Sequence, residues 1–112
     1  MMISNNELKG AIVSKRLDDF NAQDRQNIKF QEAGVHFLTG EIEDDNINEA
    51  IKWLVYENLD QTEERTLTLY INSQGGDLYN ALGLIDMMRN SHHPVRTIGL
   101  GSVMSSAFLI FV

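Results

Sequence analysis

The sequence contains no cysteine, which excludes disulfide bonds, thiolate metal sites and thiol nucleophiles. Positive charge is also scarce: 9 Lys and Arg stand against 16 Asp and Glu, and the formal net charge is −7. Because binding to nucleic acid needs clustered positive charge that neutralises phosphates, this composition argues against a nucleic-acid partner. The neighbouring histidines His92 and His93 precede the only proline, Pro94, where we expect an exposed turn. We therefore expect neither a metal site nor a cofactor.

Long apolar runs are absent as well. No stretch approaches the roughly 20 apolar residues that a membrane-spanning helix needs. The first ten residues, MMISNNELKG, lack the basic and apolar regions of a secretory signal. We expect a cytoplasmic protein without a membrane partner, and 112 residues with 43% hydrophobic content suit a single core.

The pattern that is present alternates strands with amphipathic helices. Residues 1–34 are polar and mixed, with weak helical patterns through Leu8, Ile12 and Leu17 and around Ile28 and Phe30, and we interpret them as an N-terminal arm. Beyond them, strands are expected at 35–39, 66–71 and 95–100, and helices at 47–55, capped by Asp44 or Asp45, at 78–88, and from about residue 105 onward. This order predicts an α/β fold with a mostly parallel sheet flanked by helices.

Two junctions between a strand and a helix are rich in small residues. Gly75 and Gly76 follow the second expected strand, and Gly101 and Ser102 follow the third. The carboxyl ends of parallel strands meet at one edge of a sheet, so the two junctions can share one site. A serine there can act as a nucleophile, although Ser and Gly also occur in ordinary turns and helix caps.

The residues of these junctions also resemble a known family. The segment LYINSQGGDLYNALGLIDMM, followed by TIGLGSVMSSAFLI, is similar to the proteolytic subunit of the Clp protease (ClpP) within the ClpP/crotonase superfamily, whose motifs read YINSPGG and GQAASMGAFLL. The earlier segment VHFLTGEIED fits the same register. The resemblance covers residues 35–112 and implies a ClpP/crotonase-like fold of repeated ββα and βαβ units. It would make these residues the N-terminal part of a serine peptidase domain.

The resemblance also implies roles for three residues. Ser105 matches the attacking serine, and Gly76 and Ser106 match the positions whose backbone N–H groups form the oxyanion hole. Such donors stabilise the tetrahedral oxyanion of acyl transfer. An extended peptide substrate is expected to pair with the strand edge beside Gly76.

The sequence also departs from the family motifs. Gln74 replaces a proline, Ser106 a methionine and Ala107 a glycine. In the family the catalytic histidine and acidic residue follow the serine, whereas this sequence stops at Val112. We therefore expect a domain that is incomplete at its C-terminus and nearly inactive alone.

Three functions follow from these observations. The first is a serine endopeptidase subunit that degrades unfolded polypeptides, with like subunits in a heptameric ring and a Clp-type ring ATPase as partners. The second is a catalytically inert ClpP-like interaction subunit. The third is a crotonase-like enzyme acting on acyl-CoA thioesters, which the serine at position 105 argues against, because thioester chemistry does not need it.

Overall fold

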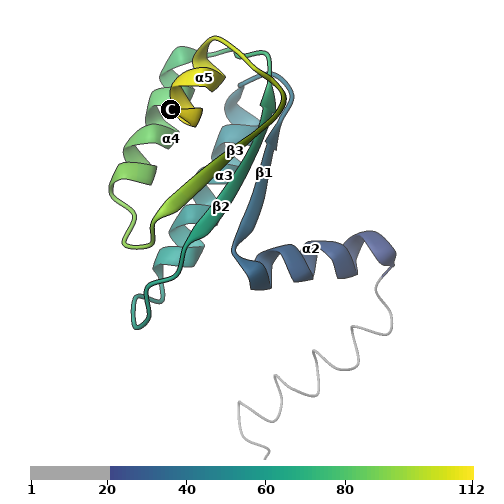
Figure 1. Ribbon diagram of the computed structural model, residues 1–112, viewed down its shortest axis with the longest axis vertical. Helices are drawn as coiled ribbons and strands as arrows, with labels where there is room; N and C mark the ends of the chain where they lie inside the picture. Colours follow the sequence, from purple (N-terminus) through teal and green to yellow (C-terminus); the bar gives the residue numbers. More distant parts are fainter. Residues whose placement is uncertain (1–20) are drawn as a thin grey trace, which may run out of the picture. The chain divides into compact units, whose positions relative to one another are not determined.

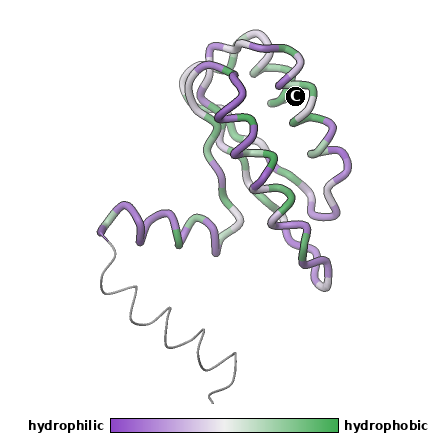
Figure 2. The backbone as a smooth tube through the Cα atoms, turned by 180° about the vertical axis from the view of Figure 1, so that it is seen from behind, coloured by the Kyte–Doolittle hydropathy of each residue, from purple (hydrophilic) through white to green (hydrophobic). Residues whose placement is uncertain are grey.

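The computed structural model describes residues 21–112, and the chain divides into two units, Met1–Glu32 and Ala33–Val112. Residues 21–32 are the described part of the first unit, and all but the first of them lie in helix α2 (Ala22–Ala33). It begins after Asn21, whose Oδ1 accepts a hydrogen bond from the backbone N–H of Asp24 at 2.8 Å. The helix is largely hydrophilic and buries none of its residues (Figure 2). The helix expected around Ile28 is thus present, and the pattern from Leu8 to Leu17 lies outside the described residues.

The second unit is built on a parallel sheet. Strands β1 (Val35–Thr39), β2 (Leu67–Ser73) and β3 (Val95–Val103) pair in the order β1-β2-β3 (Figure 1). The α/β architecture with a parallel sheet is confirmed. Strands β2 and β3 run further than expected, because Ser73 pairs with Val103 beyond an irregularity in the register. Gly101 lies in this irregularity with φ of 64°. Glycine adopts such a positive φ without steric cost, so β3 can carry more residues than β2 between the two paired positions.

Helices α3 (Asp44–Asn58), α4 (Leu78–Arg89) and α5 (Ser106–Phe111) follow the three strands and gather on one side of the sheet (Figure 1). This placement follows from the strand order, since right-handed crossovers that advance in one direction put successive helices on the same face. Alternate residues of β2, namely Leu67, Leu69 and Ile71, point into the core and are fully buried. None of the helices within residues 21–112 is long and apolar enough to cross a membrane.

The N-cap of α3 differs from the expected one, and the N-cap of α4 was not predicted. The N-cap of α3 is Glu43, so the expectation of Asp44 or Asp45 was wrong by one or two positions. Asn46 fixes this start: its Oδ1 accepts from the N–H of Glu43 at 3.0 Å, and its Nδ2 donates to the Glu41 carbonyl at 2.6 Å. Helix α4 is capped by Asp77, which accepts from the backbone N–H groups of the second and third residues of the helix at 2.8 and 3.2 Å.

The sequence predicts an exposed turn at His92 and His93, but only one of the two histidines is exposed. His92 is exposed, but His93 keeps only 2% of its surface accessible. Its Nδ1 accepts from the backbone N–H of Arg65 at 3.2 Å, and its Nε2 lies 2.7 Å from the Asp60 carbonyl oxygen. These bonds join the loop before β2 to the turn before β3. One ring nitrogen of an imidazole can accept a hydrogen bond while the other donates one, so both polar atoms of His93 have partners although the residue is buried. The local sequence around His93 does not reveal these partners.

His36 on β1 gives the unit a pH-dependent stability. Its ring stacks on Trp53 of α3 with centroids 5.1 Å apart. Burial lowers the pKa of His36 below its usual 6.5, and the Glu49 carboxylate opposes this more weakly. The unfolded chain therefore binds more protons than the folded chain between the lowered pKa and 6.5, so the stability is full above 6.5 and declines as the pH falls through this window.

We predict that urea midpoints measured from about pH 7.5 down to about pH 5.5 will fall more steeply for the wild-type chain than for His36→Phe, which keeps a ring on Trp53 without a titrating group. His92→Gln, at the exposed histidine, is the control and should retain the wild-type slope. Identical slopes for His36→Phe and the wild type would contradict the prediction.

Candidate active site

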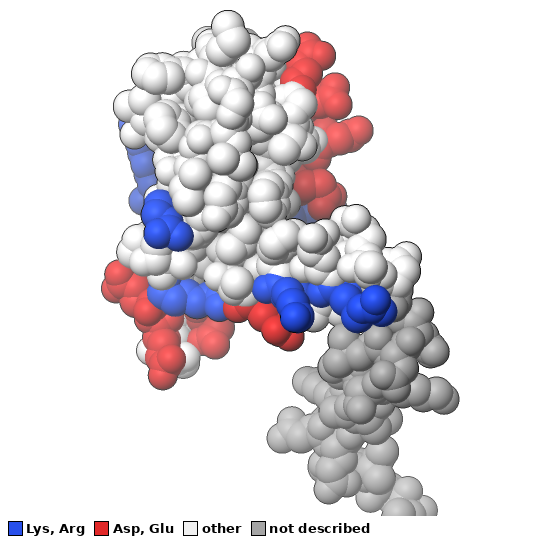
Figure 3. Space-filling view, turned by 45° about the vertical axis from the view of Figure 1, so that its right-hand side comes forward, with Lys and Arg blue, Asp and Glu red and all other residues white. Residues whose placement is uncertain are grey.

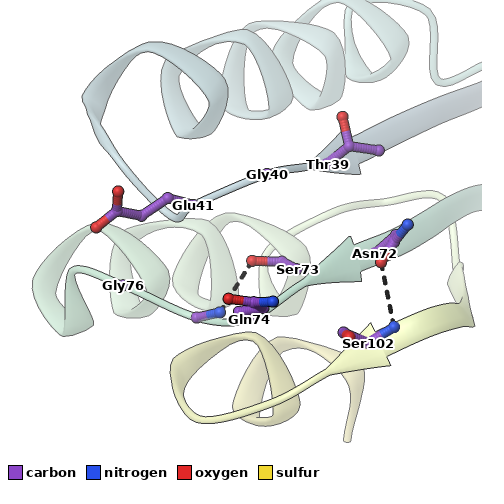
Figure 4. A pocket seen from close by; sticks show the side chains of 9 residues that line it. Thr39, Gly40, Glu41, Asn72, Ser73, Gln74, Gly76 and Ser102 are labelled. Atoms are coloured by element: carbon purple, nitrogen blue, oxygen red, sulfur yellow. Dashed lines mark hydrogen bonds between the residues drawn. The ribbon is translucent and has the colours of Figure 1, made fainter.

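A groove lies at the carboxyl edge of the sheet, where the ends of β1 and β2 approach the last residues of β3 (Figure 4). Its volume is about 680 Å³. Backbone and small polar groups dominate the lining, which consists of Thr39, Gly40, Glu41, Asn72, Ser73, Gln74, Gly75, Gly76 and Ser102. The edge at which the glycine junctions were expected to meet therefore carries a groove.

Two side chains of β2 shape the turn that borders the groove. Ser73 Oγ accepts from the backbone N–H of Gly75 at 3.1 Å, and Asn72 Oδ1 accepts from the backbone N–H of Ser102 at 3.1 Å (Figure 4). The first bond closes the glycine turn upon itself, and the second ties it to the end of β3. The two junctions are therefore held together by hydrogen bonds as well as by strand pairing.

The backbone of Ile42 fixes the other side of the glycine turn. Its N–H donates to the Gly75 carbonyl, and its own carbonyl accepts from the N–H of Asp77, both at 2.9 Å. Gly76 lies between these two bonds with φ of 152°, and a Cβ at this position would overlap the Ile42 carbonyl oxygen. Only glycine fits, because both the space and the backbone conformation exclude a side chain.

Ser105 occupies a strained position between β3 and α5. Its φ of 54° and ψ of −129° make it the only non-glycine residue with positive φ in the described part of the chain. Such strain persists only where surrounding contacts enforce it, and it is frequent at functional sites. Gly75 is in close contact with Ser105, since a Cβ on Gly75 would come within 2.7 Å of Ser105 Cβ and 3.2 Å of its Oγ. The structure thus places Ser105 directly beside the glycine turn, with its side chain exposed.

Ser106, the first residue of α5, reaches Gly76 with its side chain. Its Oγ accepts from the Gly76 N–H at 2.9 Å and lies 3.2 Å from the Gly76 carbonyl oxygen, to which it donates. The residue is 4% exposed. Its own backbone N–H has no acceptor within residues 21–112. Of the two backbone donors expected to form an oxyanion hole, one therefore binds the Ser106 hydroxyl and the other is unengaged. The family resemblance pointed to the backbone N–H of Ser106, and nothing in the sequence indicated that its side chain would bind Gly76.

The three histidines lie away from this site. His36 is in β1 against Trp53, and His92 and His93 come just before β3, whereas Ser105 follows the opposite end of that strand. None of them matches a base for Ser105. Among the described residues, no three His, Asp or Glu side chains come together to hold a metal ion.

Acidic side chains gather near the start of α3, at one margin of the molecule's second unit (Figure 3). A shallow hollow there is lined by Glu41, Glu43, Asp44, Asp45, Asp77, Ile42 and Asn80. Asp44 accepts a hydrogen bond from Asn80 Nδ2 at 2.7 Å, which links α3 to α4. These carboxylates thus serve the starts of two helices, where negative charge is favoured.

The close approach at Gly76 predicts a large cost for any side chain. Gly76→Ala should destabilise the chain by at least about 2 kcal/mol, through overlap with Ile42 and an unfavourable backbone conformation. Gly83→Ala in α4 is the matched control, because nothing lies within 4 Å of its added Cβ, and it should stabilise the chain by about 0.5–1 kcal/mol. Thermal unfolding followed by circular dichroism measures both. Equal effects of the two substitutions would contradict the described geometry.

The fold and site together define an α/β protein in which a strained serine, set between a strand and a helix, faces a glycine turn. A serine held in this way at a strand-to-helix turn is an arrangement used by serine hydrolases. A model of the Clp protease family matches residues 20–112. The chain belongs to the Clp protease family.

Individual relatives agree with this assignment. The chain is 34% identical over 83 residues to the ATP-dependent Clp protease proteolytic subunit 1 of Corynebacterium diphtheriae, covering 73% of this chain and 39% of the relative. It is 30% identical over 103 residues to the ATP-dependent Clp protease proteolytic subunit of Chlorokybus atmophyticus, covering 92% of this chain and 42% of the relative. The chain thus spans about two fifths of these curated relatives.

A solved structure shares the fold. The catalytic domain of the ClpP protease from Plasmodium falciparum superposes with a TM-score of 0.72 at 29% sequence identity, covering 80% of this chain and 48% of that one. The resemblance to ClpP is confirmed, and with it the α/β fold with a parallel sheet flanked by helices. These comparisons support a protease family and favour neither an acyl-CoA enzyme nor an inert interaction protein.

Proposed function

We propose that this chain supplies the nucleophile and oxyanion donors of a Clp-type serine endopeptidase. The observation that carries the proposal is the strained backbone of Ser105 in contact with Gly75, beside the groove at the sheet edge. In this proposal residues 35–112 form the N-terminal part of the peptidase domain and residues 1–34 form an arm that precedes it.

The proposed chemistry is acyl transfer. Ser105 Oγ attacks the carbonyl carbon of a peptide bond, its proton passes to a general base, and the carbonyl oxygen takes up negative charge. The backbone N–H groups of Gly76 and Ser106 donate to this oxygen, and the loss of one such donor typically slows catalysis by about 10²- to 10³-fold. The amine then leaves with a proton from the conjugate acid of the base, and water hydrolyses the acyl-enzyme.

In this proposal the general base is not one of the three histidines of the chain, because none of them lies beside Ser105. A serine that lacks its base loses most of its rate, since the members of a catalytic triad act as a unit. We propose that the working form is a cytoplasmic ring of like subunits, heptameric as in the family, which degrades unfolded polypeptides delivered by a Clp-type ring ATPase.

A second candidate function is an inert ClpP-like subunit that joins or blocks a ring of complete subunits. Two observations favour it specifically: no histidine of the chain lies beside Ser105, and the Gly76 N–H is already bound to Ser106. The two functions differ in whether Ser105 becomes reactive in the assembled protein.

Labelling with a fluorophosphonate probe tests the proposal. We expect the assembled protein from its natural source to become labelled, with the adduct located on Ser105 by peptide mass spectrometry. Ser105→Ala should abolish the labelling, whereas Ser102→Ala, at a neighbouring hydroxyl of the groove, should retain it. Absence of labelling in the assembled protein would contradict the peptidase function and leave the inert subunit as the interpretation.

A further inference from the structure

The two sides of Gly76 are engaged by different partners. The backbone from Gly75 to Asp77 runs parallel to Ile42, and in such a segment the peptide groups point alternately to opposite sides. The Gly75 carbonyl and the Asp77 N–H face Ile42 and bind it at 2.9 Å each. The N–H and carbonyl of Gly76 face the other way. They are therefore the groups left for a peptide that binds to this turn.

The Ser106 hydroxyl takes both of these groups. It accepts from the Gly76 N–H at 2.9 Å and donates to the Gly76 carbonyl at 3.2 Å. A hydroxyl can do this because it has one donor and two acceptor positions. Ser106 is only 4% exposed, whereas Gly76 is exposed, so the pair of bonds is partly buried.

We propose that the Ser106 hydroxyl is a built-in competitor for Gly76, which a bound carbonyl or carboxylate oxygen must displace before the Gly76 N–H can receive it. The inference rests on the proposed function only in taking Gly76 as an oxyanion donor. Ser106 is then a positioning residue whose side chain controls the availability of one donor while its backbone N–H supplies the other. Rotation of the Ser106 side chain away from Gly76 is the step that opens the site.

The competition has a measurable size. One intramolecular hydrogen bond contributes about 0.5–1.5 kcal/mol net of the bonds to water that it replaces. Removal of the Ser106 hydroxyl should therefore lower the dissociation constant of an oxygen ligand at Gly76 by roughly two- to tenfold. A purely structural role predicts the opposite, because loss of a buried bond would loosen the turn and weaken binding.

The test is titration of the ¹⁵N-labelled chain with N-acetyl-alanyl-alanine, a peptide carboxylate that resembles a cleavage product. We expect chemical-shift changes at the Gly76 amide, and a dissociation constant roughly two- to tenfold lower in Ser106→Ala than in the wild type. Thr66→Ala, at an exposed hydroxyl before β2 and outside the groove, should bind as the wild type does. Equal or weaker binding by Ser106→Ala, or no shift at Gly76 in either protein, overturns the inference.

Hydrogen exchange supplies an independent measurement that requires no substitution. The Gly76 amide of the wild type should exchange at least about tenfold more slowly than an unprotected amide, because its N–H is hydrogen-bonded to Ser106 Oγ. Exchange at the unprotected rate would overturn the inference even if Ser106→Ala failed to fold.

Carboxylate binding does not need a reactive nucleophile, so the titration can be repeated with Ser105→Ala. If Ser106→Ala tightens binding while fluorophosphonate never labels Ser105, the peptidase function fails and the competitor role stands. If Ser105 is labelled but Ser106→Ala leaves carboxylate binding unchanged, the competitor role fails and the peptidase function stands.

Discussion

The contact between the backbones of Ile42 and Gly76 is the constraint on which the site depends. The segment after β1 continues alongside the glycine turn and binds it on both sides of Gly76 at 2.9 Å. Because Gly76 has no Cβ, the turn can approach the Ile42 backbone this closely, and the next residue, Asp77, is the N-cap of α4. The opposite side of Gly76 is thereby held toward α5, where Ser106 reaches it. The contact with Ile42 and the contact with Ser106 therefore both involve one residue without a side chain.

Strain at Ser105 follows from the same arrangement. β3 is paired to β2 as far as Val103, and the N–H of Met104 still donates to the Ser73 carbonyl at 3.1 Å. The chain must then turn within one residue so that α5 can pack on the sheet. Ser105 makes that turn with positive φ, at a cost of order 1–3 kcal/mol that the surrounding structure must offset. Burial of Ala107 and Ile110 in the core provides such an offset.

Much of the fold could be predicted from the sequence because it depends on local patterns. The alternation of apolar residues in β2 and the apolar stripe of α3 locate these two elements directly. The resemblance to ClpP supplied the alignment of the strand-to-helix junctions with the family motifs. The true N-cap of α3 was missed because Asn46 competes with the aspartates through bonds to Glu43 and Glu41. The burial of His93 was missed because its partners are 28 and 33 residues away. Contacts across such separations leave no periodic signal.

The sequence predicted that the two glycine- and serine-rich junctions would lie at one edge of the sheet. It did not predict the hydrogen bonds between their residues. Gly76 and Ser106 were named for their backbone groups through the family resemblance. That the Ser106 side chain binds Gly76 depends on the side-chain torsion angle of Ser106 and on the distance between two turns 30 residues apart in the chain. Neither quantity can be read from composition or spacing. The substitution of serine for methionine at this position was visible, and its consequence emerged only from the fold.

In the proposed mechanism, Gly76 and Ser106 present their backbone N–H groups to one oxygen beside Ser105. The decisive measurement is a crystal structure of the assembled protein with Ser105 phosphonylated. We expect the phosphonyl oxygen to lie within about 3.1 Å of both backbone nitrogens, with the Ser106 hydroxyl turned away from Gly76. A phosphonyl oxygen directed into solvent, with the Ser106 hydroxyl still bound to Gly76, would contradict it.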